Sequence, residues 1–104
     1  MKTVCLRFYT EENKLHEGYL VYEYLLEKAK EFGLSGASVF KGIAGYGRHG
    51  KIHKESFFEL GSDMPVEVVI ITSNDLAIEF IRFLKEKKLN ILFTQNEVSI
   101  AVID

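Results

Sequence analysis

The chain is poor in the residues that build covalent frameworks: its 104 residues include one cysteine, one proline and no tryptophan. The lone Cys5 cannot form an internal disulfide or a multi-cysteine metal cage, so a reducing, cytoplasmic location is expected. No apolar run approaches the roughly 20 residues of a membrane-spanning helix, and the first residues lack the apolar core of a signal peptide. We therefore expect a protein that does not insert into a membrane.

An excess of positive charge is missing as well. Thirteen lysines and arginines stand against fifteen aspartates and glutamates, giving a formal net charge of −2 and an isoelectric point near 5.9. Proteins that bind nucleic acids or anionic membranes without selectivity are normally basic overall, so neither is an expected partner. The 47% hydrophobic and 27% charged residues are ordinary for a globular protein, and the length predicts one domain over residues 1–104.

Four segments have the pattern of a strand. Residues 3–9 alternate between apolar and more polar side chains, and residues 36–43 are rich in β-favouring types. The β-branched run at residues 66–71 follows the single proline and is too short for a helix. A last extended segment covers residues 91–103, and we expect it to bend or turn near residues 95–97.

Two segments have the pattern of an amphipathic helix. Apolar residues recur at helical spacing over residues 21–32, and Gly33 follows as the expected C-cap. A second apolar stripe, over residues 77–84, comes after the favourable N-cap residue Ser73. The order strand, helix, strand, strand, helix, strand is that of the α+β, ferredoxin-like βαββαβ fold. This fold is a four-stranded antiparallel sheet with both helices on one face.

The third predicted strand is apolar on both of its faces. Val66, Val68 and Ile70 share one face, and Val69 and Ile71 lie on the other. Burial of such side chains stabilises a protein by roughly 1.5–3 kcal/mol each, so a second face left in water would forfeit a sizeable term. The pattern predicts self-association through that face; the alternative is a central strand that is simply apolar throughout.

A long, basic insertion joins the second and third predicted strands. Residues 42–50 contain four glycines, and no acidic residue occurs between Phe32 and Lys54. Backbone N–H groups of a glycine-rich turn, flanked by lysine and arginine, form a natural cradle for a phosphate or a carboxylate. The alternative is a solvated hairpin tip whose charges only maintain solubility. The candidate ligand-binding residues here are Lys41, Gly42, Gly45, Tyr46, Gly47, Arg48, His49, Lys51 and His53.

Several short motifs occur in a fixed order along the chain. They include His-Glu-Gly at residues 16–18, the segment 32–39, and Gly-Tyr-Gly-Arg at residues 45–48. Leu-Gly-Ser-Asp-Met-Pro-Val at residues 60–66 then leads into the third predicted strand. The ordered set resembles the P-II-like family known as domain of unknown function 190, which is related to the nitrogen-regulatory P-II signal proteins. The resemblance covers nearly the whole chain.

The resemblance implies a homotrimer of ferredoxin-like subunits whose open sheet faces pack together. It implies a regulatory protein that senses a small anionic effector, with an adenine nucleotide as the candidate, in the clefts between subunits. The loop at residues 44–56 corresponds to the P-II T-loop, which would act on a transporter, a channel or an enzyme. By position Gly45, Gly47 and Arg48 would line the phosphate end of the cleft, and Tyr46 would shape the turn.

The exit of the second helix has a counterpart in the same family. Lys85, Lys87 and Lys88 correspond to the phosphate-gripping B-loop of P-II proteins, and they complete the set of candidate ligand-binding residues. The segment from Lys85 to Asn90 lacks the glycine of that loop. The alternative interpretation is that these lysines complement the dipole at the C-terminal end of a helix.

Metal binding is an alternative function. His49 and His53 lie four residues apart, and CutA-type metal-tolerance proteins share the trimeric fold that the resemblance implies. His16 and Cys5 are the other side chains of ligand type, but the spacing provides no evident third ligand. We therefore assign no metal ligands, while a CutA-like metal-binding trimer and a small-anion binder without a signalling role stay open.

Two further functions are disfavoured. RNA-recognition modules have this order of elements, but they need exposed aromatic side chains on the open sheet face, where residues 66–71 offer aliphatic ones. Acylphosphatases place their arginine in a glycine-rich turn before the first helix, whereas Arg48 follows the second strand and no general base is evident. We expect neither nucleic-acid binding nor enzymatic activity.

Overall fold

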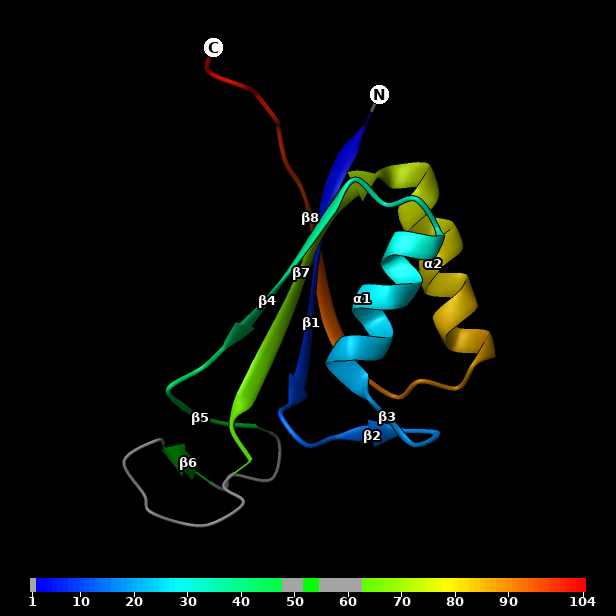
Figure 1. Ribbon diagram of the computed structural model, residues 1–104. Helices are drawn as coiled ribbons and strands as arrows, with labels where there is room; N and C mark the ends of the chain where they lie inside the picture. The colour runs from blue at the N-terminus through cyan, green and yellow to red at the C-terminus, as the bar shows by residue number, and fades with distance from the viewer. Residues whose placement is uncertain (1, 48–51, 55–62) are drawn as a thin grey trace.

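The computed structural model describes residues 2–47, 52–54 and 63–104 (Figure 1). Short elements interrupt the basic strand–helix pattern in two places, between the first strand and the first helix and again in the long insertion. In chain order the elements are β1 (Thr3–Glu11), β2 (Leu15–His16), β3 (Tyr19–Leu20), α1 (Val21–Glu31), β4 (Gly36–Lys41), β5 (Ala44–Tyr46), β6 (Ile52–Lys54), β7 (Pro65–Ser73), α2 (Asn74–Glu86) and β8 (Leu92–Glu97).

The main sheet has four strands in the order β4-β7-β1-β8, and every neighbouring pair is antiparallel. Both helices lie on the same side of this sheet, α1 beside α2 (Figure 1). The first and third long strands are therefore central, and the other two form its edges. This arrangement confirms the predicted α+β, ferredoxin-like fold.

The core lies between the helices and the two central strands. Val4, Leu6 and Phe8 of β1 are fully buried, as their alternation predicts, and Val68 and Ile70 of β7 are buried beside them. Aromatic rings extend this core to the helices and the β8 edge. Phe8 meets Phe80 of α2 edge-on at 6.2 Å between ring centroids, and it stacks on Phe93 of β8 at 5.5 Å.

The ends of the helices follow the predicted capping chemistry. The Ser73 Oγ accepts a hydrogen bond from the Leu76 N–H at 3.3 Å, which confirms Ser73 as the N-cap of α2. Phe32 is the C-cap of α1, and Gly33 follows with a φ of +75°. The N–H of Gly33 donates to Lys30 O and that of Leu34 to Ala29 O, which completes a Schellman motif in which Gly33, predicted as the C-cap, is the residue after the cap. None of the helices in the described parts is long and apolar enough to cross a membrane.

The structure corrects the sequence prediction in three places. The polar stretch before α1 contains a small hairpin, β2–β3, whose tight turn places Glu17 and Gly18 at positive φ. The second predicted strand ends at Lys41, because the following Gly42 turns towards Pro65. The predicted bend at residues 95–97 is wrong, since β8 pairs with β1 through Glu97 and the chain then leaves the sheet.

Two adjacent residues at the end of β7 make opposite contributions to stability. The Thr72 hydroxyl is fully buried and has no hydrogen-bond partner among the described residues, whereas the Ser73 hydroxyl caps α2. Thr72→Val should therefore raise the free energy of unfolding by about 1 kcal/mol, because a buried hydroxyl without a partner is unfavourable. Ser73→Ala should lower it by about 1 kcal/mol through loss of the cap. Urea unfolding of both variants measures the two shifts, and equal signs would contradict this account.

Candidate functional site at the loop base and the open sheet face

The β5–β6 hairpin forms the described part of the long insertion. Ala44 pairs with Lys54, Gly45 with His53, and Tyr46 with Ile52. The hairpin projects from the end of the sheet where β4 finishes and β7 begins, at the lower left of Figure 1. The described part of the insertion therefore projects from the end of the sheet.

Two of its glycines lie close to Pro65, and the approach of Gly42 leaves no room for a larger residue. The Gly42 N–H donates to Pro65 O at 2.7 Å, and a Cβ at Gly42 would lie 2.8 Å from the Pro65 Cγ. A Cβ at Gly45 would lie 3.3 Å from the same atom. At Gly47, by contrast, nothing lies within 4 Å. Gly42 and Gly45 therefore serve packing at the base of the hairpin, and only Gly47 among these three faces open space.

Acidic side chains lie at the base of the basic insertion. Lys41 Nζ is 3.2 Å from Glu12 Oε2, so this predicted ligand-binding lysine already has a partner. The adjacent Asn13 N–H donates to Asp63 Oδ1 at 2.7 Å, and the Glu12 N–H donates to Met64 O at 2.8 Å. The segment just after β1 is thereby fastened to the start of β7. The fold thus brings Glu12 to Lys41, within a stretch (residues 32–54) that has no acidic residue of its own.

The same region exposes apolar side chains. Ile43 is 76% and Tyr46 75% exposed, and Ile52 on the paired strand is also exposed. Exposed apolar groups beside a backbone extension are typical of a surface that contacts another protein chain.

Several predicted ligand-binding residues are not placed. Arg48, His49 and Lys51 lie outside the described residues, and for His53 the structure describes the backbone pairing with Gly45 but not the side chain. Their contribution to an anion site stays a prediction.

The lysines at the C-terminal end of α2 lie at the same end of the molecule but away from the hairpin. Lys85, Lys87 and Lys88 are exposed, and Figure 1 shows the end of α2 and the β5–β6 hairpin on opposite sides of that end. The N–H groups of Lys88 and Leu89 donate to Lys85 O and Leu84 O, so these amides already have partners. Among the described residues of one chain, the two halves of the predicted site do not come together.

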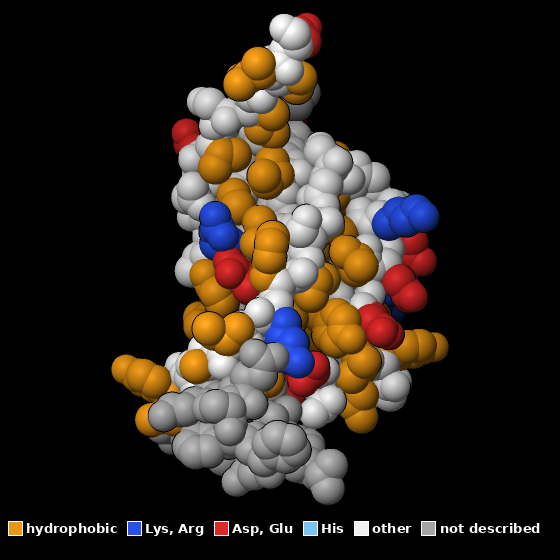
Figure 2. All heavy atoms as spheres, turned by 60° about the vertical axis from the view of Figure 1, so that its left-hand side comes forward, with side chains coloured by type: hydrophobic (Ala, Val, Ile, Leu, Met, Phe, Trp, Pro, Cys, Tyr) orange, Lys and Arg blue, Asp and Glu red, His pale blue; other side chains and the backbone are white. Residues whose placement is uncertain are grey.

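The sheet face opposite the helices mixes apolar residues with paired charges. Arg7 Nη1 lies 2.8 Å from Glu67 Oε1, and this hydrogen bond raises the pKa of the arginine. Val69 is half-buried beside this pair, while Phe40 and Leu92 on the two edge strands are exposed. Figure 2 brings this side forward and shows hydrophobic side chains spread between adjacent positive and negative ones. Because the charges are paired with each other, a second protein surface can cover this face without isolating a charge.

The described residues contain no group of three or more His, Cys, Asp or Glu side chains that could hold a metal ion. Cys5 is buried in β1, and His16 packs edge-on against Tyr24 at 5.1 Å between ring centroids. Burial also raises the pKa of Tyr24, as expected for a phenol withdrawn from water. Cys5 and His16 are thus part of the packing of the subunit.

The residues that sequence reasoning missed are Glu12, Asp63 and Pro65. Asp63 and Pro65 belong to the motif at residues 60–66, but their contacts at the loop base, like that of Glu12, involve residues far away in the sequence, so the motif does not reveal them. The register of β1 on β7, which pairs Glu11 with Pro65, is the signal that could have placed them together.

The chain matches a known protein family over almost its full length. A model of the DUF190 family, described as uncharacterized ACR, matches residues 3–100. A UPF0166 protein of Aquifex aeolicus (strain VF5) is 43% identical over 100 residues, which cover 96% of this chain and 94% of that protein.

Solved structures with low sequence identity share the fold. CPII of Thiomonas intermedia K12, bound to ADP and bicarbonate, has a TM-score of 0.68 at 12% identity, covering 96% of this chain and 89% of that chain. The divalent ion tolerance protein CutA1 of Ehrlichia chaffeensis has a TM-score of 0.62 at 16% identity, covering 98% and 87%. Both likenesses concern the fold.

The contact of Gly42 with Pro65 leads to a test by substitution. Gly42→Ala should lower the free energy of unfolding by about 1–3 kcal/mol, because the new methyl group would overlap the proline ring. Gly47→Ala is the matched control and should change it little, since that Cβ would meet open space. In a double-mutant cycle, Pro65→Ala should recover part of the loss in Gly42→Ala by removing the Cγ atom. Additive effects in chemical denaturation would contradict the proposed contact.

Proposed function

The chain belongs to the DUF190 family, and from this premise we propose that it is a P-II-like regulatory protein. In this proposal it forms a homotrimer in the cytoplasm and senses a small anionic effector, with an adenine nucleotide as the first candidate. The effector binds in the clefts between subunits, and the loop at residues 44–56 acts on a partner. The proposed role is binding and regulation, without catalysis.

The open sheet face supports self-association. It presents half-buried Val69 beside exposed Phe40 and Leu92, and its charged residues Arg7 and Glu67 are already paired. Covering the apolar groups removes them from water, while the ion pair keeps its partner. Assembly of subunits would also serve the effector proposal, because the described part of the hairpin and the C-terminal end of α2, where the three lysines lie, are apart within one chain.

The base of the β5–β6 hairpin is the observation that carries the effector proposal. Packing of Gly42 and Gly45 on Pro65 holds the hairpin at the sheet edge, so the cationic residues of the insertion are presented from a fixed base. Lysine and arginine bind phosphate and carboxylate groups through charge-assisted hydrogen bonds. CPII, which shares this fold, is bound to ADP and bicarbonate, and these two anions are therefore the first ligands to test.

The exposed Ile43 and Tyr46 support a partner-docking role for the loop. A transporter, a channel or an enzyme is the proposed class of partner. An effector bound at the hairpin base would lie close to Ile43 and Tyr46 and would change the conformation in which the loop meets its partner.

A CutA-like metal-binding trimer is the second candidate, because the CutA1 fold is also shared. With Cys5 and His16 packed in the subunit, His49 and His53 of the insertion are its available ligands. Titration with copper(II) separates the two candidates. Tight copper binding that His53→Ala abolishes, together with no response to nucleotides, would favour the metal-binding function.

The trimer is tested by light scattering. The wild type should have a mass about three times its 11.9 kDa chain mass. Val69→Asp should dissociate it while preserving the helical circular dichroism, because the change adds an unpaired charge to the open face. Ile78→Asp, at an exposed apolar position on α2, is the matched control and should leave the trimer intact. A wild-type particle of 11.9 kDa in dilute solution would overturn the trimer.

The effector site is tested by calorimetry with ATP, ADP, AMP, cyclic AMP and bicarbonate. Glu12→Gln should raise the affinity for the bound anion about twofold to fivefold, the effect of releasing a surface ion pair of about 0.5–1 kcal/mol at Lys41.

The chain provides a matched control for this measurement. Lys2 Nζ and Glu97 Oε1 form a similar exposed ion pair, at 2.9 Å, near the opposite end of β1. Glu97→Gln should leave anion affinity unchanged. No heat with any of these anions, from an intact trimer, would overturn the effector proposal.

A further inference from the structure

The chain continues beyond β8 as an extended segment with a strand-like composition. Val98 is still attached to the sheet, since its N–H donates to Thr3 O at 3.1 Å, and residues 99–104 then project away from the molecule (Figure 1). The segment 98–103, Val-Ser-Ile-Ala-Val-Ile, is rich in β-branched residues. Val102 is 82% exposed and Ile103 is fully exposed.

Residues 99–104 extend beyond the strand that lies next to β8 in the sheet. Its neighbour β1 begins at Thr3, which is level with Val98, and none of the described strands continues beside residues 99–104. Within the part of the chain that the structure describes, no backbone hydrogen bond links residues 99–104 to another segment. An apolar strand of this kind is prone to pair with another chain.

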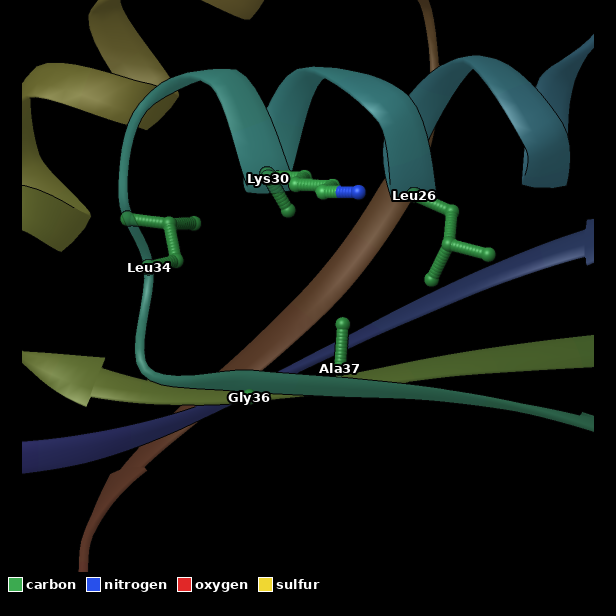
Figure 3. A pocket seen from close by; sticks show the side chains of 6 residues that line it. Leu26, Lys30, Leu34, Gly36 and Ala37 are labelled. Atoms are coloured by element: carbon green, nitrogen blue, oxygen red, sulfur yellow. The ribbon is translucent and has the colours of Figure 1, made fainter.

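A complementary edge lies on the other side of the sheet. β4 is a terminal strand of the described sheet, so its outer N–H and C=O groups face away from β7. A hollow of about 260 Å³ lies between this strand and α1. Figure 3 shows Leu26 and Lys30 of α1 above it, with Gly36 and Ala37 of β4 below. The small side chain of Ala37 leaves this space open, and its lining is mainly apolar.

We propose that residues 98–103 of one copy add as a fifth strand to the outer edge of β4 in a second copy, with Ile100 and Val102 covering the hollow. This inference rests on the proposed homotrimer and names a contact that holds it together. Main-chain hydrogen bonds would provide affinity, and the alternate apolar side chains would provide the register.

Length, pattern and charge agree with one alignment. The six residues of β4 match the six residues 98–103, and the antiparallel arrangement sets Val102 opposite Ala37 and Ile100 opposite Val39. Ala37 and Val39 pair with Ile70 and Val68, which are buried on the helix face of the sheet.

The same arrangement brings the carboxylate of Asp104 to the end of β4 near Lys30. A parallel arrangement would carry Asp104 to the other end of β4, where Lys41 is already paired with Glu12. Charge therefore favours the antiparallel alignment.

The contact joins two different surfaces, because β8 and β4 are at opposite edges of the sheet. A contact of this kind repeats from copy to copy and closes into a ring when the rotation permits. It is therefore compatible with three identical subunits around an axis, whereas tail-to-tail pairing would produce a dimer.

Disulfide trapping tests this contact directly, because the only natural cysteine is buried. The Ala37→Cys/Val102→Cys variant, oxidised in dilute solution, should migrate mainly as covalent oligomers up to three chains, since opposite residues on antiparallel strands are within disulfide reach. Glu79→Cys/Val102→Cys is the matched control, with its first cysteine on the exposed side of α2, and should stay uncrosslinked. Co-refolded single variants Ala37→Cys and Val102→Cys should yield a covalent dimer containing one of each.

Other patterns would overturn the inference in distinct ways. Crosslinking of Val102→Cys alone would indicate tail-to-tail pairing, and a fast-migrating crosslinked monomer would show the tail folded onto its own β4. A trimer in light scattering without a specific crosslink would overturn the strand contact but leave the proposed trimer standing. A monomer would overturn both.

Discussion

The contact between Gly42 and Pro65 determines where the long insertion leaves the sheet. Pro65 opens β7, whose position is fixed by pairing with β1 on one side and β4 on the other. Gly42 follows β4 directly, and its 2.7 Å hydrogen bond to Pro65 O requires an approach that a Cβ would prevent. The direction of the β5–β6 hairpin therefore follows from the packing of the central strand, and a proposed effector site built on this hairpin inherits the rigidity of the core.

Folding also changes the electrostatics that the linear sequence presents. Residues 32–54 contain lysine and arginine but no acidic residue, whereas β1 brings Glu12 to within 3.2 Å of Lys41 at the base of the insertion. An anion that approaches there competes with a carboxylate of the protein. A phosphate with two negative charges is attracted more strongly by Lys41 than a single carboxylate is, but it is also repelled more strongly by Glu12. The ion pair therefore weakens the attraction of this position for any anion.

The sequence predicted the order of the main elements because their side chains repeat with periods that the sheet and helices impose. Val4, Leu6 and Phe8 are buried as their alternation requires, and the cap of α2 is at Ser73. The β2–β3 hairpin escaped prediction, since strands of two residues are too short to show a period. The contacts of the loop base escaped it for a different reason: they join residues far apart in sequence and depend on strand register, which composition does not reveal.

The projecting segment 98–103 and the hollow beside β4 are two consequences of one geometry. The chain after β8 extends past the beginning of β1, and β4 ends the sheet with small Ala37 under α1. Among the described residues, neither this extension nor the outer edge of β4 has a neighbouring strand. Either feature alone would be an aggregation hazard. The segment 98–103 and the outer edge of β4 lie at opposite edges of the sheet, so the segment of each copy can pair with the β4 edge of the next copy. In a closed ring of copies, every segment and every β4 edge is then paired. The open sheet face would then be turned inward by the same assembly, so that edge pairing and face burial stabilise one arrangement of subunits.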